Sequence, residues 1–225
     1  MLVEAYRDLK YLLNRGYRKG SAIEFVANHY RLRKTERHIL VRCVFSDSWI
    51  EEVEKKLLGP GDLKGKTLAV DGFNVLITLE SILDGKAFLC EDGLVRDLKY
   101  QGKYRVNERT PELLTNIAEA LKGLGLGKVY FFYGKNVPKS GIIKEMTESA
   151  IIKFDVPGEV KLVKSPDFEL KKFEIVATAD IGIIAKTRGV FDLAAYVGRI
   201  HGKSPLPFEE VLRRWGSRVN GELNI

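Results

Sequence analysis

Apolar segments alternate with amphipathic ones from residue 66 onward, and this alternation constrains the fold more than any other feature. Short runs with the composition of buried strands are separated by segments that repeat apolar residues at helical spacing. A hairpin at 88–96, with its turn at 91–93, is expected after the first helix. Such alternation requires right-handed crossovers and a mostly parallel sheet, which predicts an α/β domain over residues 66–225. Strands are expected at 67–71, 128–133, 160–164 and 174–178, and helices at 74–83, 111–123, 140–153, 192–200 and about 207–217.

The first 58 residues are expected to form helices only. Apolar side chains recur at helical spacing between residues 2 and 13. Ser21 and Ser48 each stand three residues before a glutamate, as in a capping box, and Thr35 is placed to cap a helix between them. Residues 59–62, Gly-Pro-Gly-Asp, then interrupt any regular element. We therefore expect a helical domain over residues 1–60 ahead of the α/β domain.

Positive charge is concentrated near the N-terminus. The chain has a net charge of +7, and its first 42 residues hold ten Lys or Arg and four acids. Such an excess favours a polyanionic partner, most often nucleic acid. A solvated, lysine- and arginine-rich helical surface would give the same pattern.

Composition also bears on the compartment. No apolar run reaches the length of a membrane span, and the N-terminus has no signal-peptide core. Cys43 and Cys90, the two cysteines, are too few for a disulfide framework. We therefore expect a cytoplasmic protein with reduced thiols and no membrane partner, and the sequence leaves a homodimer open.

Two of the expected strands lead directly to an aspartate. Residues 67–71 end at Asp71, and Asp180 follows residues 174–178. If the strands build outward from the first and the fourth returns to its other side, the two carboxylates meet where open α/β sheets bind ligands. Close carboxylates repel each other unless a cation neutralises them, and oxygen ligands suit Mg²⁺ or Mn²⁺. Each aspartate could instead cap the helix that follows it.

These two segments resemble motifs of a known superfamily. Val70-Asp71-Gly72-Phe73-Asn74-Val75-Leu76 is similar to the first-strand motif of PIN-like nucleases, including their NYN branch. Ala177-Thr178-Ala179-Asp180-Ile181-Gly182-Ile183-Ile184 is similar to their later strand motif. The whole chain also resembles an uncharacterised prokaryotic family that joins a small helical domain to such a domain. The resemblance implies a three-layer α/β fold and a Mg²⁺- or Mn²⁺-dependent ribonuclease with three or four clustered acids.

The resemblance assigns roles to particular residues. Asp71 and Asp180 match the metal-binding acids, with Asn74 and Thr178 in supporting positions. Asp192 is placed like a further acid, although it could equally be a helix cap. The resemblance implies one more metal-binding acid, and four residues are candidates for it. Two of them, Asp97 and Glu80, would reach the cleft if the hairpin folds over it. No carboxylate follows the second strand, where NYN-like members often have one, and this departure bears on catalytic competence. The four candidates are Glu80, Glu91, Asp92 and Asp97.

Basic residues in three places are candidates for nucleic-acid contacts. Lys135 and Lys139 precede a helix that Ser140 could cap, and a helix N-terminus is a ready anion site. The stretch 99–105 interleaves aromatic and basic side chains, which suits base stacking or a charged edge strand. A helix-turn-helix spacing from residue 21 to residue 42 could present further basic side chains to a groove or to phosphates. Those side chains are Arg31, Arg33, Lys34, Arg37 and Arg42.

Several enzyme classes lack their sequence signatures here. Phe73 stands where a haloacid-dehalogenase phosphatase needs its second aspartate. No GxxxxGK[ST] run is present, and no GxGxxG follows the first strand, which argues against a P-loop and a dinucleotide site. The histidines are dispersed, so zinc is not expected. The leading hypothesis is a metal-dependent nuclease whose expected substrate is RNA, with DNA as the alternative. The alternatives are an inactive PIN-like nucleic-acid-binding protein and a helix-turn-helix regulator.

Overall fold

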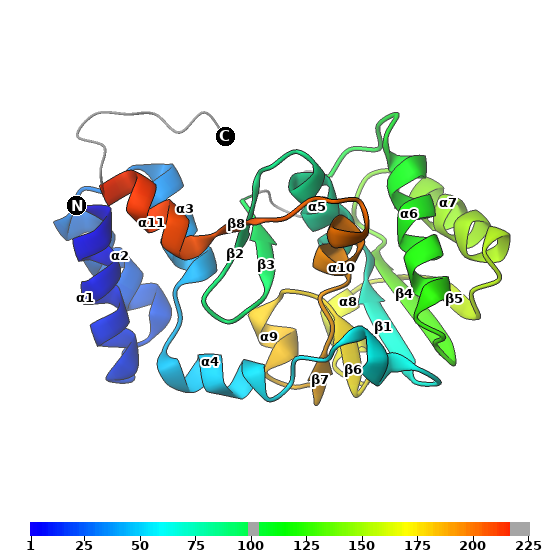
Figure 1. Ribbon diagram of the computed structural model, residues 1–225, viewed down its shortest axis with the longest axis horizontal. Coiled ribbons are helices and arrows are strands. Elements are labelled where there is room, and N and C mark those ends of the chain that lie inside the picture. Colours follow the sequence, from blue (N-terminus) through cyan, green and yellow to red (C-terminus); the bar gives the residue numbers. More distant parts are fainter. Residues whose placement is uncertain (99–103, 217–225) are drawn as a thin grey trace.

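A five-stranded sheet with all strands parallel lies at the centre of the α/β part of the molecule (Figure 1). The computed structural model describes residues 1–98 and 104–216. The predicted strands are all present, and the short β7 is an addition, since a run of two residues carries no periodicity. The strands are β1 (Thr67–Asp71), β4 (Lys128–Gly134), β5 (Gly158–Val163), β6 (Ile175–Ala177) and β7 (Gly189–Val190).

The strand order β5-β4-β1-β6-β7 places β1 at the centre of the sheet. The chain builds outward from β1 through β4 to β5, and then returns to the other side of β1 with β6 and β7. In the β1–β6 pair, Ala69 lies opposite Val176 and Val70 lies opposite Ala177. The order of connection therefore reverses between β1 and β6, and the prediction that these two strands are neighbours is confirmed.

Helices cover both faces of the sheet because successive β1 side chains point in opposite directions. Leu68 and Val70 pack with one group of helices, and Ala69 packs with the other. The result is a three-layer α/β arrangement. The first group comprises α5 (Gly72–Leu83), α6 (Thr110–Gly123), α7 (Ser140–Lys153) and α10 (Leu193–Ile200), and the second comprises α4 (Asp47–Glu54), α8 (Pro166–Leu170) and α9 (Ile181–Ile184).

The N-terminal helices α1 (Leu2–Asn14), α2 (Lys19–His29) and α3 (Lys34–Cys43) form a second core with segments from much later in the chain (Figure 1). Phe88 and Cys90 of the hairpin and Phe208 of the last helix lie in this core. The predicted hairpin and last helix are confirmed. They are β2 (Ala87–Leu89) with β3 (Val95–Asp97), joined in a small sheet by β8 (Leu206–Pro207), and α11 (Phe208–Gly216).

The region before residue 60 also contacts the large sheet. Val53 of α4 is fully buried against the face that carries Ala69. The Leu58 N–H donates to the Val190 carbonyl at 2.9 Å, and the Val190 N–H donates to the Lys56 carbonyl at 2.8 Å, so residues 56–58 extend the sheet beside β7. The hydrophobic packing therefore continues across the predicted division between residues 60 and 66.

Four predicted helix caps are wrong: another side chain takes the role at α4 and α3, whereas α2 and α7 begin at Lys19 and Ser140 with no side-chain cap. Ser46, not Ser48, caps α4, and its hydroxyl accepts the Trp49 N–H at 3.3 Å. Ser21 lies inside α2, which begins at Lys19. Thr35 lies in the first turn of α3, where the Glu36 carboxylate accepts the Arg33 N–H at 2.7 Å. Ser140 lies inside the first turn of α7 and donates to the Lys135 carbonyl at 3.5 Å.

None of the helices in the described part of the chain is long and apolar enough to span a membrane. Most of the basic and aromatic stretch 99–105 lies outside the described residues, so its predicted role is not taken further.

Candidate functional site

Asp71 stands at the carboxyl end of the central strand and begins the next helix. Its Oδ1 accepts the Asn74 N–H at 3.3 Å, which makes it the N-cap of α5. The strand passes into the helix without a loop, which brings Gly72 against the ring of Tyr133. A Cβ at Gly72 would collide with that ring, so only glycine fits at this junction. Asp71 is consequently 3% exposed and held at a fixed place on the sheet edge.

Thr178 connects Asp71 to the aspartate that follows the neighbouring strand. Its hydroxyl donates to Asp71 Oδ2 at 3.2 Å and accepts the Asp180 N–H at 3.2 Å. The Asn74 side-chain oxygen accepts the Ala179 N–H at 2.9 Å. The start of α5 and the end of β6 are therefore fastened together by polar groups on both sides.

Asp180 is the exposed member of this arrangement. It caps the short helix α9, and its Oδ1 accepts the N–H groups of Gly182 and Ile183 at 2.8 and 3.2 Å. The cap role that the sequence left open is thus present for both aspartates. A cap uses only part of a carboxylate's capacity, since each carboxylate can accept about four hydrogen bonds.

A third acid approaches from α8, and the sequence analysis missed it. The negative charges of Asp167 and Asp180 both raise the pKa of Asp71. Asp167 lies in the first turn of α8, which follows β5 and is capped by Ser165. The Ser-Pro-Asp sequence at 165–167 signals this helix start, but nothing local in it indicates that the helix lies beside β1.

The pKa of Asp71 is raised to about 7, principally because the carboxyl is buried. Hydrogen bonds from the Asn74 N–H and the Thr178 hydroxyl lower the pKa again, and the charges of Asp167 and Asp180 add to the rise. Asp71 is therefore close to half protonated near neutral pH. A cation placed among these carboxylates would favour the ionised form.

The other predicted acids have hydrogen-bond partners of their own, although Asp192 borders a small hollow that Asn74 and Thr178 also line. Asp192 caps α10, with Oδ1 accepting the Ala195 N–H at 2.9 Å and Oδ2 accepting the Val95 N–H at 2.7 Å. Burial raises its pKa. Asp97 is buried and accepts the Thr78 hydroxyl at 3.1 Å. The cap interpretation of Asp192 is thus present, and its backbone bonds tie the hairpin to α10.

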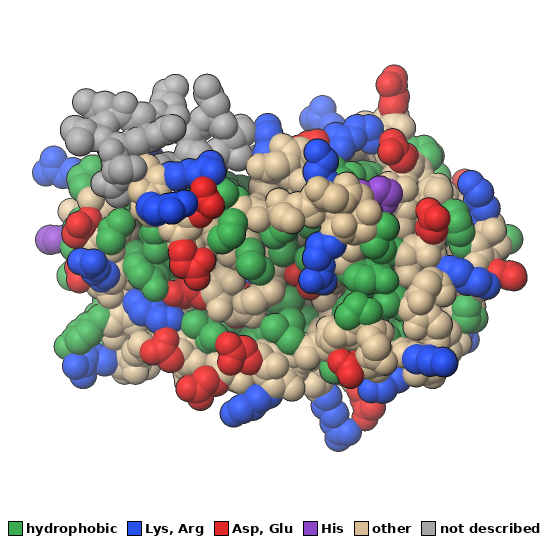
Figure 2. All heavy atoms as spheres, viewed as in Figure 1, with side chains coloured by type: hydrophobic (Ala, Val, Ile, Leu, Met, Phe, Trp, Pro, Cys, Tyr) green, Lys and Arg blue, Asp and Glu red, His purple; other side chains and the backbone are tan. Residues whose placement is uncertain are grey.

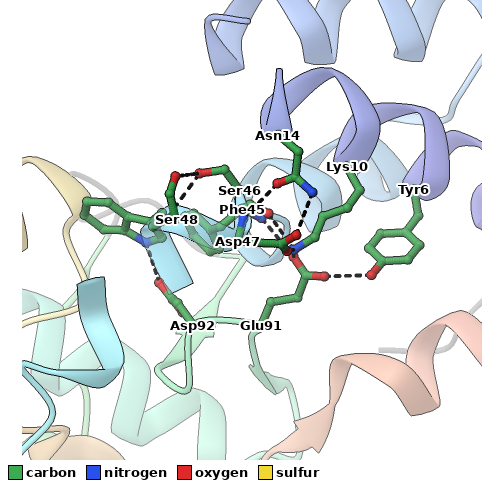
Figure 3. A network of polar contacts seen from close by, with 10 residues as sticks. Tyr6, Lys10, Asn14, Phe45, Ser46, Asp47, Ser48, Glu91 and Asp92 are labelled. Carbon is green, nitrogen blue, oxygen red and sulfur yellow. Dashed lines mark hydrogen bonds and ion pairs between the residues drawn. The ribbon is translucent and has the colours of Figure 1, made fainter. Parts of the chain in front are cut away.

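The three remaining candidates also have local partners. Glu80 accepts the Asn107 side-chain amide at 2.9 Å. Asp92 forms a buried bidentate pair with Arg96, at 2.6 and 2.7 Å. Glu91 belongs to a polar network under the N-terminal helices (Figure 3). We therefore place no metal-binding role on these three.

A cavity of about 290 Å³ opens between α3 and the Asp180 edge of the sheet. His38, Val41 and Arg42 line it from α3, and Asp180 and Ile181 line it from the start of α9. Burial lowers the pKa of His38, and the nearby charges of Lys34, Arg42 and Arg37 lower it further. The helix-turn-helix spacing is present, but this face of its second helix points toward the sheet edge.

The other basic candidates lie on exposed positions. Lys135 and Lys139 follow β4, the neighbour of β1, and so lie at the same sheet edge as Asp71. Arg33 pairs with Glu36 at 3.1 Å. On the face shown in Figure 2, basic and acidic side chains are interspersed over the whole molecule, so this face carries no continuous basic field. The remaining exposed candidates are Arg31, Lys34 and Arg37.

The donor set at the sheet edge fits only one kind of metal site. Within residues 1–98 and 104–216, no group of three or more His, Cys, Asp or Glu side chains is arranged to hold a metal ion. Mg²⁺ commonly binds through one or two carboxylates and keeps several waters. The Asp71 and Asp180 pair, with Asp167 nearby, fits such a water-rich site and not a closed cage.

Comparison with known proteins gives family membership and no activity. A model described as a domain of unknown function, DUF5616, matches residues 60–196. The chain belongs to the DUF5616 family. A model described as a protein of unknown function, DUF434, matches residues 1–56. The chain is 42% identical to "Uncharacterized protein MJ0935" from Methanocaldococcus jannaschii. The alignment spans 189 residues, which is 83% of this chain and 90% of that protein. No solved structure matches the chain significantly.

The two matched segments build the cavity jointly. Asp71, Asp167 and Asp180 lie in the DUF5616 segment, whereas His38 and Arg42 lie in the DUF434 segment. Any ligand that occupies the cavity between α3 and Asp180 would therefore touch both segments.

Proposed function

We propose that this DUF5616 protein is a divalent-metal-dependent nuclease with a PIN-like fold, and that it hydrolyses RNA in preference to DNA. The observation that carries the proposal is the Thr178 hydroxyl, which joins Asp71 to the backbone of Asp180 at the reversal of strand order. Open α/β sheets bind ligands at this position. The preference for RNA rests on the resemblance to PIN-like ribonucleases.

Asp71 and Asp180 would hold Mg²⁺ or Mn²⁺, and the negative charge of Asp167 would add to the attraction for the cation. Such an ion, when bound, polarises a phosphodiester and lowers the pKa of a water that it holds. A bound cation would offset the effects of burial and neighbouring charge that raise the pKa of Asp71, so Asp71 would serve as an ionised ligand. Thr178 and Asn74 hold the carboxyl ends of β1 and β6 together through their hydrogen bonds.

Basic side chains on two sides of Asp71 would hold the phosphates of the strand. Arg42 lies in the cavity beside Asp180, and Lys135 and Lys139 follow the neighbouring strand β4. Contacts of this kind contribute affinity without sequence preference, and they weaken as salt is added. We expect Arg42→Ala to weaken RNA binding and to reduce its salt dependence. Arg188→Ala is the matched control, because Arg188 precedes β7 and lies at the opposite edge of the sheet.

The decisive experiment follows cleavage of a fluorescent single-stranded RNA with Mn²⁺, with Mg²⁺ and with a chelator. Asp71→Asn and Asp180→Asn should each abolish the metal-dependent cleavage. Asp155→Asn should leave it unchanged, because Asp155 is exposed and lies before β5, at the far edge of the sheet. Cleavage at the wild-type rate by either of the first two variants would exclude the proposed site.

A second candidate is a protein that binds RNA without cutting it. The observation in its favour is that no group of three metal-binding side chains exists in the described part of the chain. Residues 135 and 136, which follow β4, are also not acidic. This function predicts RNA binding that survives Asp180→Asn and no cleavage with either metal.

A further inference from the structure

The two cysteines meet between the N-terminal helices and the hairpin. Cys43 is the last residue of α3, and Cys90 follows β2. Their Sγ atoms lie 2.6 Å apart, although 47 positions separate the residues in the chain. Both are free thiols, 0% and 4% exposed. Their closeness therefore comes from tertiary packing and not from local sequence.

The backbone holds both residues firmly where they meet. The Glu91 N–H donates to the Cys43 carbonyl at 3.2 Å, and the Cys90 N–H donates to the Leu94 carbonyl at 3.0 Å. Glu91 also accepts the Phe45 N–H at 2.9 Å, two residues after Cys43 (Figure 3). A disulfide has a sulfur–sulfur length of about 2.05 Å, so the two sulfurs need to approach by only about half an ångström.

The surroundings favour a crosslink over an exchange catalyst. Burial raises the pKa of the Cys43 thiol well above its usual range, so this group is protonated at neutral pH. The positive charge of Arg96 lowers that pKa, but the effect of burial is larger. Catalytic thiols are exposed and have lowered pKa values, which does not describe Cys43.

We propose that Cys43 and Cys90 form an intramolecular disulfide when the protein meets a peroxide, and that this bond ties α3 to the β2–β3 hairpin. Cys90, the more exposed of the two thiols, is oxidised by the peroxide to a sulfenic acid, with release of water. The second thiol attacks that sulfur, the sulfur–sulfur bond forms, and a second water leaves. Two thiols lose two electrons and two protons in total, and the peroxide accepts them.

The bond would join two walls of the cavity beside Asp180. His38 and Arg42 come from α3, which Cys43 ends, and Arg96 comes from β3, which pairs with the strand before Cys90. Oxidation would therefore fix the spacing of these walls. The inference does not depend on the nuclease proposal, because it concerns only the two thiols and the elements that carry them.

Intact mass and thiol alkylation of the full chain test the proposal. The protein is purified with reductant, exposed to hydrogen peroxide, denatured and treated with iodoacetamide. The expected product has lost the mass of two hydrogens, takes up no iodoacetamide, and yields a linked peptide containing both cysteines. Retention of two alkylatable thiols, a gain of oxygen mass, or a linked dimer would each overturn it.

A thermal melt separates the crosslink from general oxidation. A disulfide that closes a loop of this length should raise the Tm by the order of 10 °C in the oxidised wild type. Cys43→Ser and Cys90→Ser should show no such rise after the same treatment. An equal rise in either variant would contradict the assignment, and the mass result on the wild type stands even if a variant fails to fold.

Discussion

Asp71 combines a buried carboxyl with two neighbouring negative charges, so its titration should control stability. Its folded-state pKa of about 7 exceeds the usual 3.8, and the folded protein therefore holds this proton longer than the unfolded chain does. The stabilisation from this proton is fully present below pH 3.8 and falls as the pH rises from 3.8 to about 7. Above about pH 7 it is lost. We predict that Asp71→Asn raises the free energy of unfolding by about 2 kcal/mol near pH 8 and has little effect near pH 4. Urea unfolding of both proteins across this range measures the difference, and Asp155→Asn is the control.

Lys19 presents the opposite case of a buried cation. Its Nζ is buried and has no hydrogen-bond acceptor among the described residues, and it lies above the Phe45 ring. Burial lowers its pKa from 10.5 to about 7, and the charge of Arg96 contributes. The unfolded chain therefore binds this proton more tightly, and stability falls as the pH drops from 10.5 to about 7.

Replacing Lys19 with methionine should remove that pH dependence. We predict that Lys19→Met abolishes a slope of up to about 1.4 kcal/mol per pH unit and stabilises the protein at neutral pH. Lys153→Met is the matched control, because Lys153 is an exposed lysine that also lies over a phenylalanine ring. Equal slopes for wild type and Lys19→Met in chemical unfolding would contradict the prediction.

Among the elements, the β2–β3 hairpin connects the N-terminal helices to the rest of the molecule. Glu91, the first residue of the hairpin turn, accepts hydrogen bonds from the Tyr6 hydroxyl at 2.7 Å, the Lys10 ammonium at 3.3 Å and the Phe45 N–H at 2.9 Å (Figure 3). We predict that Glu91→Ala lowers the free energy of unfolding by about 2–4 kcal/mol, since partly buried donors lose their acceptor. Glu159→Ala should change it little, because Glu159 forms only exposed ion pairs. A double-mutant cycle with Tyr6→Phe would measure how much of this free energy comes from the hydrogen bond between the Tyr6 hydroxyl and Glu91.

The elements also show how far the sequence could predict this structure. The strand–helix alternation predicts β1 and β6 as neighbours because few chain paths satisfy the right-handed crossover. It does not predict Asp167, since the approach of α8 to β1 depends on the path after β5. The alternation also does not predict that Ser46, and not Ser48, caps α4. The start of this helix is fixed by a distant partner, because the Asp47 N–H donates to the Asn14 side chain of α1, 33 positions away, at 2.8 Å.

At the scale of the whole molecule, the chain is held together by contacts between its ends. α11, near the C-terminal end, packs on α1, and Phe208 lies in the core of the N-terminal helices. α4, near the N-terminal end, covers one face of the large sheet. The family models divide the chain between residues 56 and 60, whereas the two cores are each built from both sides of that point.

This interlocking predicts one cooperative unfolding transition for the full chain. Separation of the two segments would expose Phe88 and Phe208 on one side and the Ala69 face of the sheet on the other. Exposed apolar surface costs about 25 cal/mol per Å², so neither part should be stable alone. Circular dichroism and tryptophan fluorescence should give coincident urea transitions, and a fragment lacking residues 1–58 should bind a hydrophobic dye and lose its near-UV signal. Two separate transitions, or a fragment with native near-UV circular dichroism, would show that the α/β core folds independently of the N-terminal helices.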